Sequence, residues 1–259
     1  MTSARQTLPP PAQPALFPLE AQELPRQPIP QATCITEPAG NAPRDRRDVF
    51  NGRLIRGLTL VGHYDIPKLD ACTLVPDRLI AFSEAVGMGE PDPAAWVHSY
   101  EDDYKTERLW RSPEEYFPKL RGFAGVICPD HSTYRNMPRA QQIYNIYRNQ
   151  LLGASMQVDG CNVIPNVRLS GRDSIPYALA GIPSRSTLAL GLHGCTKLRE
   201  NRSHVIDEIR MLCDLCEPAN LVVYGSAAYG VLDYPLALGI PVHVYAPDSF
   251  RRSVSREAS

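Results

Sequence analysis

The sequence lacks a long hydrophobic run, a large net charge and a regular cysteine pattern. No apolar stretch approaches the ~20 residues that a membrane-spanning helix needs, so we expect no membrane partner. The formal net charge is −1, which gives no overall electrostatic reason to bind nucleic acid. The seven cysteines are irregularly spaced, and the N-terminus has no basic start followed by an apolar core. We therefore expect a cytoplasmic protein without a disulfide framework.

Large apolar residues are also scarce in residues 1–43, which hold ten of the 25 prolines. Proline fixes φ and removes a backbone donor, and such a stretch buries too little surface to offset its ordering entropy. We predict a disordered proline-rich arm over residues 1–43 and a flexible tail over residues 250–259. Residues 44–249 are predicted to form a single α/β domain.

Within this domain the sequence repeats one unit, in which a short apolar run is followed by a polar cluster and then a helical stretch. The predicted strands are residues 96–100, 123–128, 162–167, 187–192, 221–224 and 242–245, with earlier candidates at 58–61 and 79–82. The predicted helices are residues 113–120, 138–156, 199–216 and 229–238. The first of these helices has Ser112 as a candidate N-cap and Pro113 at its first position.

Strands that alternate with helices predict a parallel sheet. We expect a (β/α)₈-like barrel, complete or incomplete; the alternative is an open doubly wound sheet, because strand order is not visible in the sequence. In both architectures ligands bind at the carboxyl ends of the strands. We therefore expect the functional site among the side chains that directly follow the predicted strands.

Carboxylates follow two neighbouring predicted strands. Asp102 and Asp103 come after the first, within an acidic run that begins at Glu101, and Asp130 follows the second. Asp102 and Asp130 are candidate catalytic groups, and Asp102, Asp103 and Asp130 are candidate ligands of a divalent metal such as Mg²⁺. The alternative is structural, because acidic residues at helix starts often cap helices or pair with nearby basic side chains.

An amide and a guanidinium follow the next strand at alternate positions. Asn166 and Arg168 suit a phosphate or carboxylate ligand, and Arg148 on a predicted helix is a further candidate. The alternative for Arg168 is a buried structural pair with Asp130 or Asp173. A helix-surface arginine such as Arg148 is more often solvated.

The remaining candidates follow the last strands. His193 is a candidate general acid or metal ligand, and the neighbouring Cys195 is a weaker candidate nucleophile. Ser226 can donate to a phosphate, although its surroundings lack the spacing of a P-loop. For Ser226 the alternative is a tight turn between a strand and a helix.

Several longer motifs resemble a family of bacterial, archaeal and phage proteins described as domain of unknown function 4417. They are Tyr100-Glu101-Asp102-Asp103-Tyr104, Glu107-Arg108-Leu109-Trp110, Gly125-Val126-Ile127-Cys128-Pro129-Asp130, Tyr147-Arg148-Asn149, Val163-Ile164-Pro165-Asn166-Val167-Arg168, His193-Gly194-Cys195 and Tyr224-Gly225-Ser226. The resemblance covers residues 58–249, departs from the family at Leu169 and after Ser226, and implies a cytoplasmic protein of prokaryotes or mobile elements. It implies no particular reaction.

Together these residues favour an enzyme that acts on a polar or phosphorylated, nucleotide-like substrate. We expect metal-assisted hydrolysis as its reaction. The alternative is a non-catalytic protein of a phage or mobile element that associates with nucleic acid, which the net charge does not favour. A partner-recruiting adaptor is a weaker third hypothesis, because the proline-rich arm has no repeated PxxP pattern.

Overall fold

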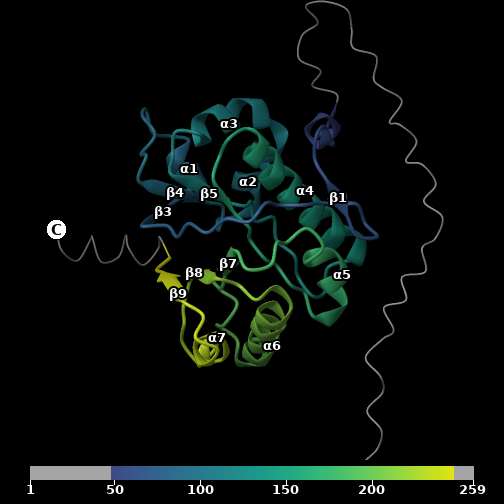
Figure 1. The fold of residues 1–259 in the computed structure, drawn as a ribbon, viewed down its shortest axis with the longest axis vertical. Helices are drawn as coiled ribbons and strands as arrows, with labels where there is room; N and C mark the ends of the chain where they lie inside the picture. The colour runs from purple at the N-terminus through teal and green to yellow at the C-terminus, as the bar shows by residue number, and fades with distance from the viewer. Residues whose placement is uncertain (1–47, 248–259) are drawn as a thin grey trace, which may run out of the picture. The chain divides into compact units, whose positions relative to one another are not determined.

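The computed structural model describes residues 48–247, which belong to one compact unit. The arm predicted over residues 1–43 and the tail predicted over residues 250–259 lie outside the described residues. Within the described range, parallel strands alternate with helices (Figure 1), so the predicted α/β class is confirmed.

The parallel strands form two sheets, with the orders β3-β4-β5-β6 and β7-β8-β9. Their bounds are β3 (Arg78–Ala81), β4 (Ala95–His98), β5 (Gly125–Ile127), β6 (Val163–Ile164), β7 (Thr187–Gly191), β8 (Asn220–Tyr224) and β9 (Val242–Tyr245). All six strands predicted from residue 96 onward are present, and most are shorter than predicted.

A parallel bridge between Asn166 and Ala189 links the end of β6 to β7. The amide of Val167 donates to the carbonyl of Ala189 (2.9 Å), and the amide of Ala189 donates to the carbonyl of Pro165 (2.8 Å). Strands that follow one another in the sequence are therefore neighbours from β3 to β9. Residues 48–247 show neither the strand-order reversal of a doubly wound sheet nor a β9–β3 ladder that closes a barrel.

Of the two early strand candidates, the first differs from the expectation. β1 (Leu60–Val61) pairs antiparallel with β2 (Ile66–Pro67) in a separate two-stranded sheet. The chain reverses between them through Gly62 and Asp65, which both have positive φ. The second candidate, residues 79–82, is β3, and its last residue already begins α1 (Phe82–Ala85).

All four predicted helices are present in residues 48–247, one of them shortened, together with three that were not predicted. Besides α1, they are α2 (Asp103–Arg111), α3 (Pro113–Leu120), α4 (Arg139–Val158), α5 (Ile175–Ala178), α6 (Arg199–Cys216) and α7 (Asp233–Ala237), with 3₁₀ turns η1 (Gly52–Ile55) and η2 (Arg172–Ser174). α3 and α6 have the predicted bounds, although Ser112 makes no side-chain cap bond. α7 begins four residues later than predicted because Tyr229 and Gly230 have positive φ, which a helix cannot include.

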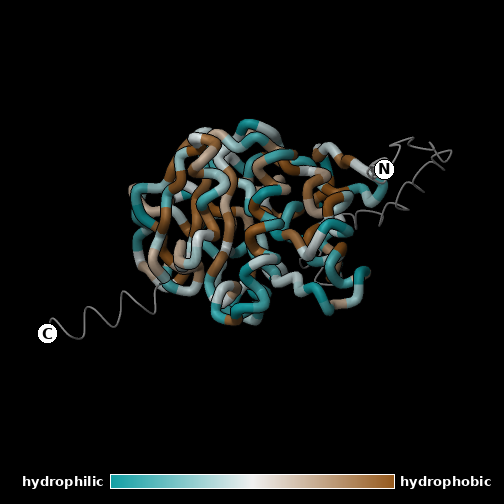
Figure 2. The backbone as a smooth tube through the Cα atoms, turned by 90° about the horizontal axis from the view of Figure 1, so that it is seen from below, coloured by the Kyte–Doolittle hydropathy of each residue, from teal (hydrophilic) through white to brown (hydrophobic). Residues whose placement is uncertain are grey.

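The strands bury side chains on both faces, as parallel sheets do. One buried cluster takes a residue from each of β3 to β8 and packs against Tyr245 of β9; its strand members are Leu79, Trp96, Ile127, Ile164, Ala189, Val222 and Tyr224. A second cluster joins β3 to β6 to α1–α4, and a third joins β7 and β8 to α6. The helices accordingly lie on opposite sides of the strands (Figure 1), and hydrophobic segments run through the interior (Figure 2). Because one cluster contacts both sheets, they share an interior.

No helix within residues 48–247 combines the length and the apolar character that crossing a bilayer requires.

Gly181 provides a test of this packing, because a Cβ there would collide with the backbone of Pro67 and with the side chain of Gln150. We expect Gly181→Ala to lower the free energy of unfolding by about 1–3 kcal/mol, since the backbone of β2 would have to move. Urea denaturation measures the effect. Gly89→Ala is the matched control, because a Cβ at Gly89 meets nothing within 4 Å. Equal stability of the two variants would contradict this close approach of β2 to Gly181.

Candidate functional site

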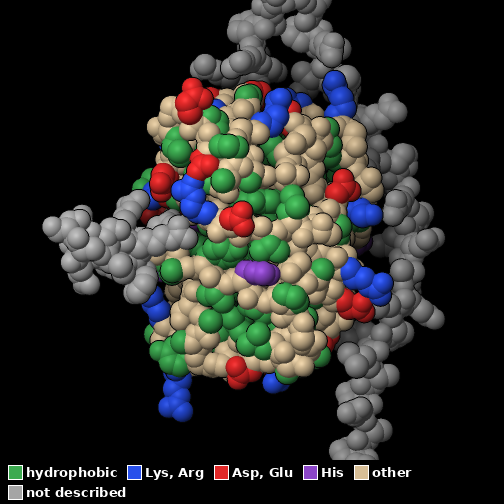
Figure 3. Space-filling view, turned by 60° about the vertical axis from the view of Figure 1, so that its left-hand side comes forward, with side chains coloured by type: hydrophobic (Ala, Val, Ile, Leu, Met, Phe, Trp, Pro, Cys, Tyr) green, Lys and Arg blue, Asp and Glu red, His purple; other side chains and the backbone are tan. Residues whose placement is uncertain are grey.

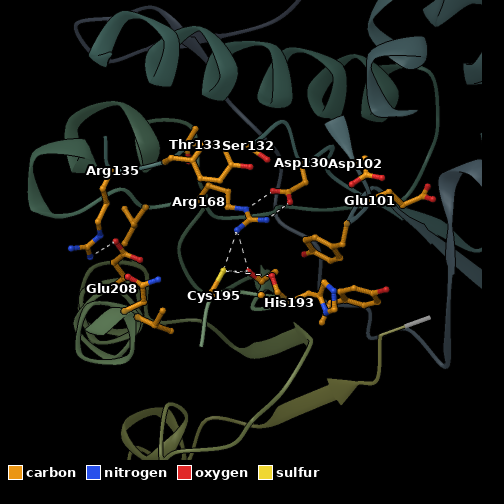
Figure 4. Close-up of a pocket in the computed structure, with 18 of the residues that line it drawn as sticks. Glu101, Asp102, Asp130, Ser132, Thr133, Arg135, Arg168, His193, Cys195 and Glu208 are labelled. Carbon is orange, nitrogen blue, oxygen red and sulfur yellow. Dashed lines mark hydrogen bonds and ion pairs between the residues drawn. The ribbon is translucent and has the colours of Figure 1, made fainter. Parts of the chain in front are cut away.

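A pocket of about 970 Å³ lies at the carboxyl ends of the parallel strands (Figure 4). Every strand of the two parallel sheets contributes a lining residue at or just beyond its end: Ala81, Tyr100, Asp130, Arg168, Gly191, Tyr224 and Pro247. Four residues predicted from the sequence, Asp102, Asp130, Arg168 and His193, line this one pocket. We call it the main pocket.

An ion pair between Asp130 and Arg168 forms the centre of the main pocket. Nε of Arg168 donates to Oδ1 of Asp130 (2.6 Å), and Nη2 donates to Oδ2. Nη1 donates to the carbonyl of Gly191 (3.1 Å) on β7. The Asp130 side chain is 4% exposed and that of Arg168 is 23% exposed. The pair thus corresponds to the structural alternative considered for Arg168, although both residues face the cavity.

Asn166 forms a hydrogen bond with Asp130 of this pair. Its Nδ2 donates to Oδ1 of Asp130 (2.7 Å), and its Oδ1 accepts a hydrogen bond from the Tyr100 hydroxyl (2.9 Å). Asn166 is buried and does not line the main pocket. In this conformation it orients Asp130, so direct substrate binding by Asn166 stays a prediction.

Burial and the Asp130 carboxylate shift the pKa values of this network. Burial and the nearby Asp130 carboxylate raise the pKa of Tyr100 well above its usual value. For Arg168, burial alone would lower the pKa, but the charge and hydrogen bonds of Asp130 outweigh it and raise the pKa. Arg168 therefore keeps its charge and Tyr100 keeps its hydroxyl proton.

The three acidic residues after β4 have different surroundings. Glu101 accepts hydrogen bonds from the amide (2.8 Å) and hydroxyl of Ser83 and from Lys105 (2.9 Å). Burial opposes ionisation of Glu101, but the bonds from Ser83 and Lys105 lower its pKa. Asp103 accepts from the amide and hydroxyl of Ser132 (3.1 and 3.0 Å) and does not line the main pocket. The Asp102 carboxylate lines the pocket and makes no hydrogen bond or ion pair with any described residue.

Residues 48–247 contain no group of three or more His, Cys, Asp and Glu side chains arranged to hold a metal ion. The predicted set of Asp102, Asp103 and Asp130 does not form one, because Asp103 bonds Ser132 and Asp130 is occupied by Arg168. Of the three, Asp102 alone has a carboxylate available to an ion in the pocket.

His193 and Cys195 lie on the opposite wall, after β7 (Figure 4). His193 is exposed to the cavity, and Sγ of Cys195 lies 4.0 Å from Nη1 of Arg168. The ring of His193 meets that of Tyr224 edge-on at 6.3 Å.

Two predicted residues lie elsewhere. Arg148 donates to Glu107 (2.7 Å) and Asn145 (3.1 Å) and does not line the main pocket. Ser226 also lies outside the lining, and its hydroxyl accepts from the amide of Ala228 (3.2 Å), as in a tight turn. The structure therefore gives neither residue a contact with the main pocket.

One charged pair of the pocket was not predicted. Glu208 of α6 accepts from Arg135 (2.7 Å) and from the amide of Gly171 (2.9 Å), which joins three segments at the pocket wall (Figure 4). Burial raises the pKa of Glu208 against the opposing effect of Arg135. The sequence signal that could have identified Glu208 is its position three residues after Val205, beside the apolar stripe of a predicted helix.

A set of amides on α4 holds the loop that follows β5. Gln142 donates to the carbonyls of Tyr134 and Met137 (3.0 and 2.9 Å), Asn145 to that of Ser132 (2.6 Å) and Asn149 to that of His131 (3.1 Å). The amides are three and four residues apart, so they share a helix face. This loop supplies Ser132 to Asn136 to the pocket wall.

His131 is a buried titratable group of that loop. Its side chain is 0% exposed, and its Nδ1 lies 2.6 Å from Oδ1 of Asn149. Burial, helped by the charge of Arg148, lowers the pKa of His131 to about 4.

Replacement of Asp130 should destabilise the protein, because Arg168 would keep a charge without its partner. We expect Asp130→Ala to lower the free energy of unfolding by about 3 kcal/mol. The double variant Asp130→Leu/Arg168→Met should lose less stability than the sum of the losses of Asp130→Leu and Arg168→Met, measured by urea denaturation. Strictly additive losses would contradict a coupled pair.

The buried His131 predicts a loss of stability in acid. Unfolded histidine binds a proton below about pH 6.5, whereas folded His131 stays neutral down to about pH 4. The free energy of unfolding should therefore fall as the pH falls from about 6.5 to 4, by up to about 3 kcal/mol from this group. His131→Gln should show a smaller fall over the same range in urea denaturation. Parallel pH profiles for the two proteins would refute this assignment.

Comparisons with known proteins agree with the resemblance seen in the motifs. The family model described as Domain of unknown function (DUF4417) matches residues 58–237. The Gene 1 protein of Mycobacterium phage D29 is 31% identical over 173 residues, which cover 64% of this chain and 62% of that protein. The Gene 1 protein of Mycobacterium phage L5 is 32% identical over 167 residues, which cover 63% of this chain and 72% of that protein.

No solved structure matches the chain. The matched region spans about three fifths of the length of the D29 protein. The family model includes β3 to β8 and nearly all of the pocket-forming segments. The chain therefore belongs to the family described as Domain of unknown function (DUF4417).

Proposed function

We propose that this protein is an enzyme that acts on a polar substrate in the main pocket. One observation carries the proposal: residues from the ends of all seven parallel strands line a single open cavity. Asp102, Asp130, Arg168 and His193 lie in it together, although they come from four separate strand ends. Convergence of polar groups at the carboxyl ends of parallel strands is the usual placement of active sites in such folds.

The charges of the pocket refine the substrate class. Its carboxylates are Glu101, Asp102, Asp130 and Glu208, and its cations are Lys105, Arg135 and Arg168. Each cation is paired with a carboxylate. The lining thus carries a formal charge of −1, with the histidines neutral. A phosphorylated or nucleotide-like substrate in this pocket would need its charge balanced by protonated histidine or by a divalent cation.

Hydrolysis is the reaction that we propose. Asp102 is the best candidate for a general base or for one ligand of Mg²⁺, which commonly binds one or two carboxylates together with substrate phosphates. His193 is the candidate general acid on the opposite wall, and Arg168, fixed by Asp130, orients an anionic group of the substrate.

The second candidate is a non-catalytic protein that associates with nucleic acid in a phage or mobile element. The phage origin of the relatives favours this context. On the face shown in Figure 3, however, basic and acidic side chains are interspersed and form no basic stripe.

We also propose that the strands form an incomplete barrel. The sequential order of β3 to β9, the cluster of inward side chains from every strand, and the hydrogen bond from the Tyr245 hydroxyl to the carbonyl of Pro76 support this. A cytoplasmic location remains a proposal from the sequence.

Activity assays of the full chain test the enzyme proposal. Hydrolysis of nucleoside mono- and triphosphates and of p-nitrophenyl phosphate should be measured with Mg²⁺, Mn²⁺ or Zn²⁺. We expect His193→Asn and Asp102→Asn each to lower the rate by roughly 10²-fold or more with little change in melting temperature, because both residues are exposed. His63→Asn is the control, since His63 is exposed and outside the pocket.

Thermal melting with the same metals and nucleotides provides a second measurement, because a bound ligand stabilises the folded state. A shift that disappears in Asp102→Asn supports a metal or substrate at that carboxylate. No turnover and no shift, together with salt-sensitive binding to random DNA, would favour the nucleic-acid alternative.

A further inference from the structure

A smaller cavity of about 50 Å³ lies next to the main pocket, against α6. We call it the side pocket. Seven of its lining side chains are apolar and come from α6 and from positions at or just beyond the ends of β6 and β7: Val167, Leu169, Leu190, Leu192, Val205, Ile209 and Leu212. All except the partly buried Leu169 are buried.

The side pocket adjoins the main pocket. Six residues line both cavities, so the boundary between them includes polar as well as apolar groups: Arg168, Leu169, Gly191, Cys195, Val205 and Glu208. Arg168 is held by Asp130 and by the carbonyl of Gly191, and Glu208 is held by Arg135. These bonds fix the side chains of Arg168 and Glu208 at the boundary between the two cavities. Beyond them the walls of the side pocket are apolar.

We propose that the side pocket binds a short apolar group of a ligand whose polar part lies in the main pocket. A cavity of roughly 10–15 Å³ holds one water molecule, so this one has room for a chain of about three or four non-hydrogen atoms. Its walls offer water few hydrogen-bond partners, and an alkyl group gains free energy on leaving water. This deepens the proposed function, on which it rests, by adding a specificity determinant: the substrate carries a small aliphatic or comparable apolar substituent beside its polar centre.

Disulfide exchange at Cys195 tests this inference without a known substrate. The probes are cysteamine disulfides that carry methyl to hexyl chains. The Cys195 thiolate attacks the alkyl-bearing sulfur, forms a mixed disulfide with the alkyl thiol and releases cysteamine, while excess cysteamine keeps the exchange reversible. Peptide mass spectrometry then measures the fraction of Cys195 that is modified at equilibrium.

We expect the exchange equilibrium at Cys195 to rise about fourfold per added methylene, the gain for one buried CH₂, and to level off near propyl or butyl. Val205→Leu, which fills part of the side pocket, should end the rise about one carbon earlier. Ile206→Leu, at the next residue of α6 and outside the lining, should not change it.

Two references keep the result interpretable. Unfolded protein in urea should show no such dependence on chain length, and Cys195→Ser should lose the modification of this peptide. A folded protein with equal exchange for all chain lengths, or with the same profile in Val205→Leu, would overturn the proposal. Because no turnover is needed, this outcome would leave the hydrolase proposal standing, and absence of hydrolysis would leave the side pocket standing.

Discussion

The ion pair between Asp130 and Arg168 connects three strands at the point where the pocket begins. Asp130 follows β5, Arg168 follows β6, and the guanidinium also reaches the carbonyl of Gly191 at the end of β7. This junction coincides with the place where the ladder between the two sheets narrows to one bridge at Asn166. Side-chain bonds thus reinforce the sheet where its backbone bonds are few. The same geometry sets a charged, rigid group at the centre of the cavity.

The walls of the pocket depend on helices that lie behind them. The amides of Gln142, Asn145 and Asn149 bind backbone carbonyls of the loop after β5, so α4 uses buried polar groups as well as apolar ones to pack against the rest of the molecule. Glu208 of α6 likewise holds part of the pocket wall, because it accepts hydrogen bonds from Arg135 and from the amide of Gly171. A loop fixed in this way loses little conformational freedom on binding a ligand, which favours affinity.

The pocket combines paired cations, one unpaired carboxylate and an adjoining apolar cavity. Lys105, Arg135 and Arg168 all have carboxylate partners. The Asp102 carboxylate lines the cavity and has no cationic partner among the described residues. Such a lining favours a ligand with few charges, or a phosphorylated ligand accompanied by a cation, over a bare polyanion. The side pocket against α6 adds room for an apolar group next to Arg168. The main pocket would then orient the polar part of a substrate, and the side pocket would select the apolar group next to it.

Local patterns in the sequence determined the repeated strands and helices, because apolar periodicity and helix-start residues act over a few neighbouring positions. They correctly predicted α3, α6 and the strands from β4 to β9, and the positions that directly follow the predicted strands include Asp102, Asp130, Arg168 and His193 of the pocket lining. Tertiary structure decided which candidate side chains are bonded to other residues of the chain. Asp130 pairs with Arg168, Asp103 accepts from Ser132, and Arg148 pairs with Glu107 outside the pocket lining. It also decided that residues 60–61 leave the parallel sheets and that Glu208 enters the pocket wall. The physical reason is that a side chain's partner comes from a segment tens of residues away, and a short-range pattern contains no information about which segment that is.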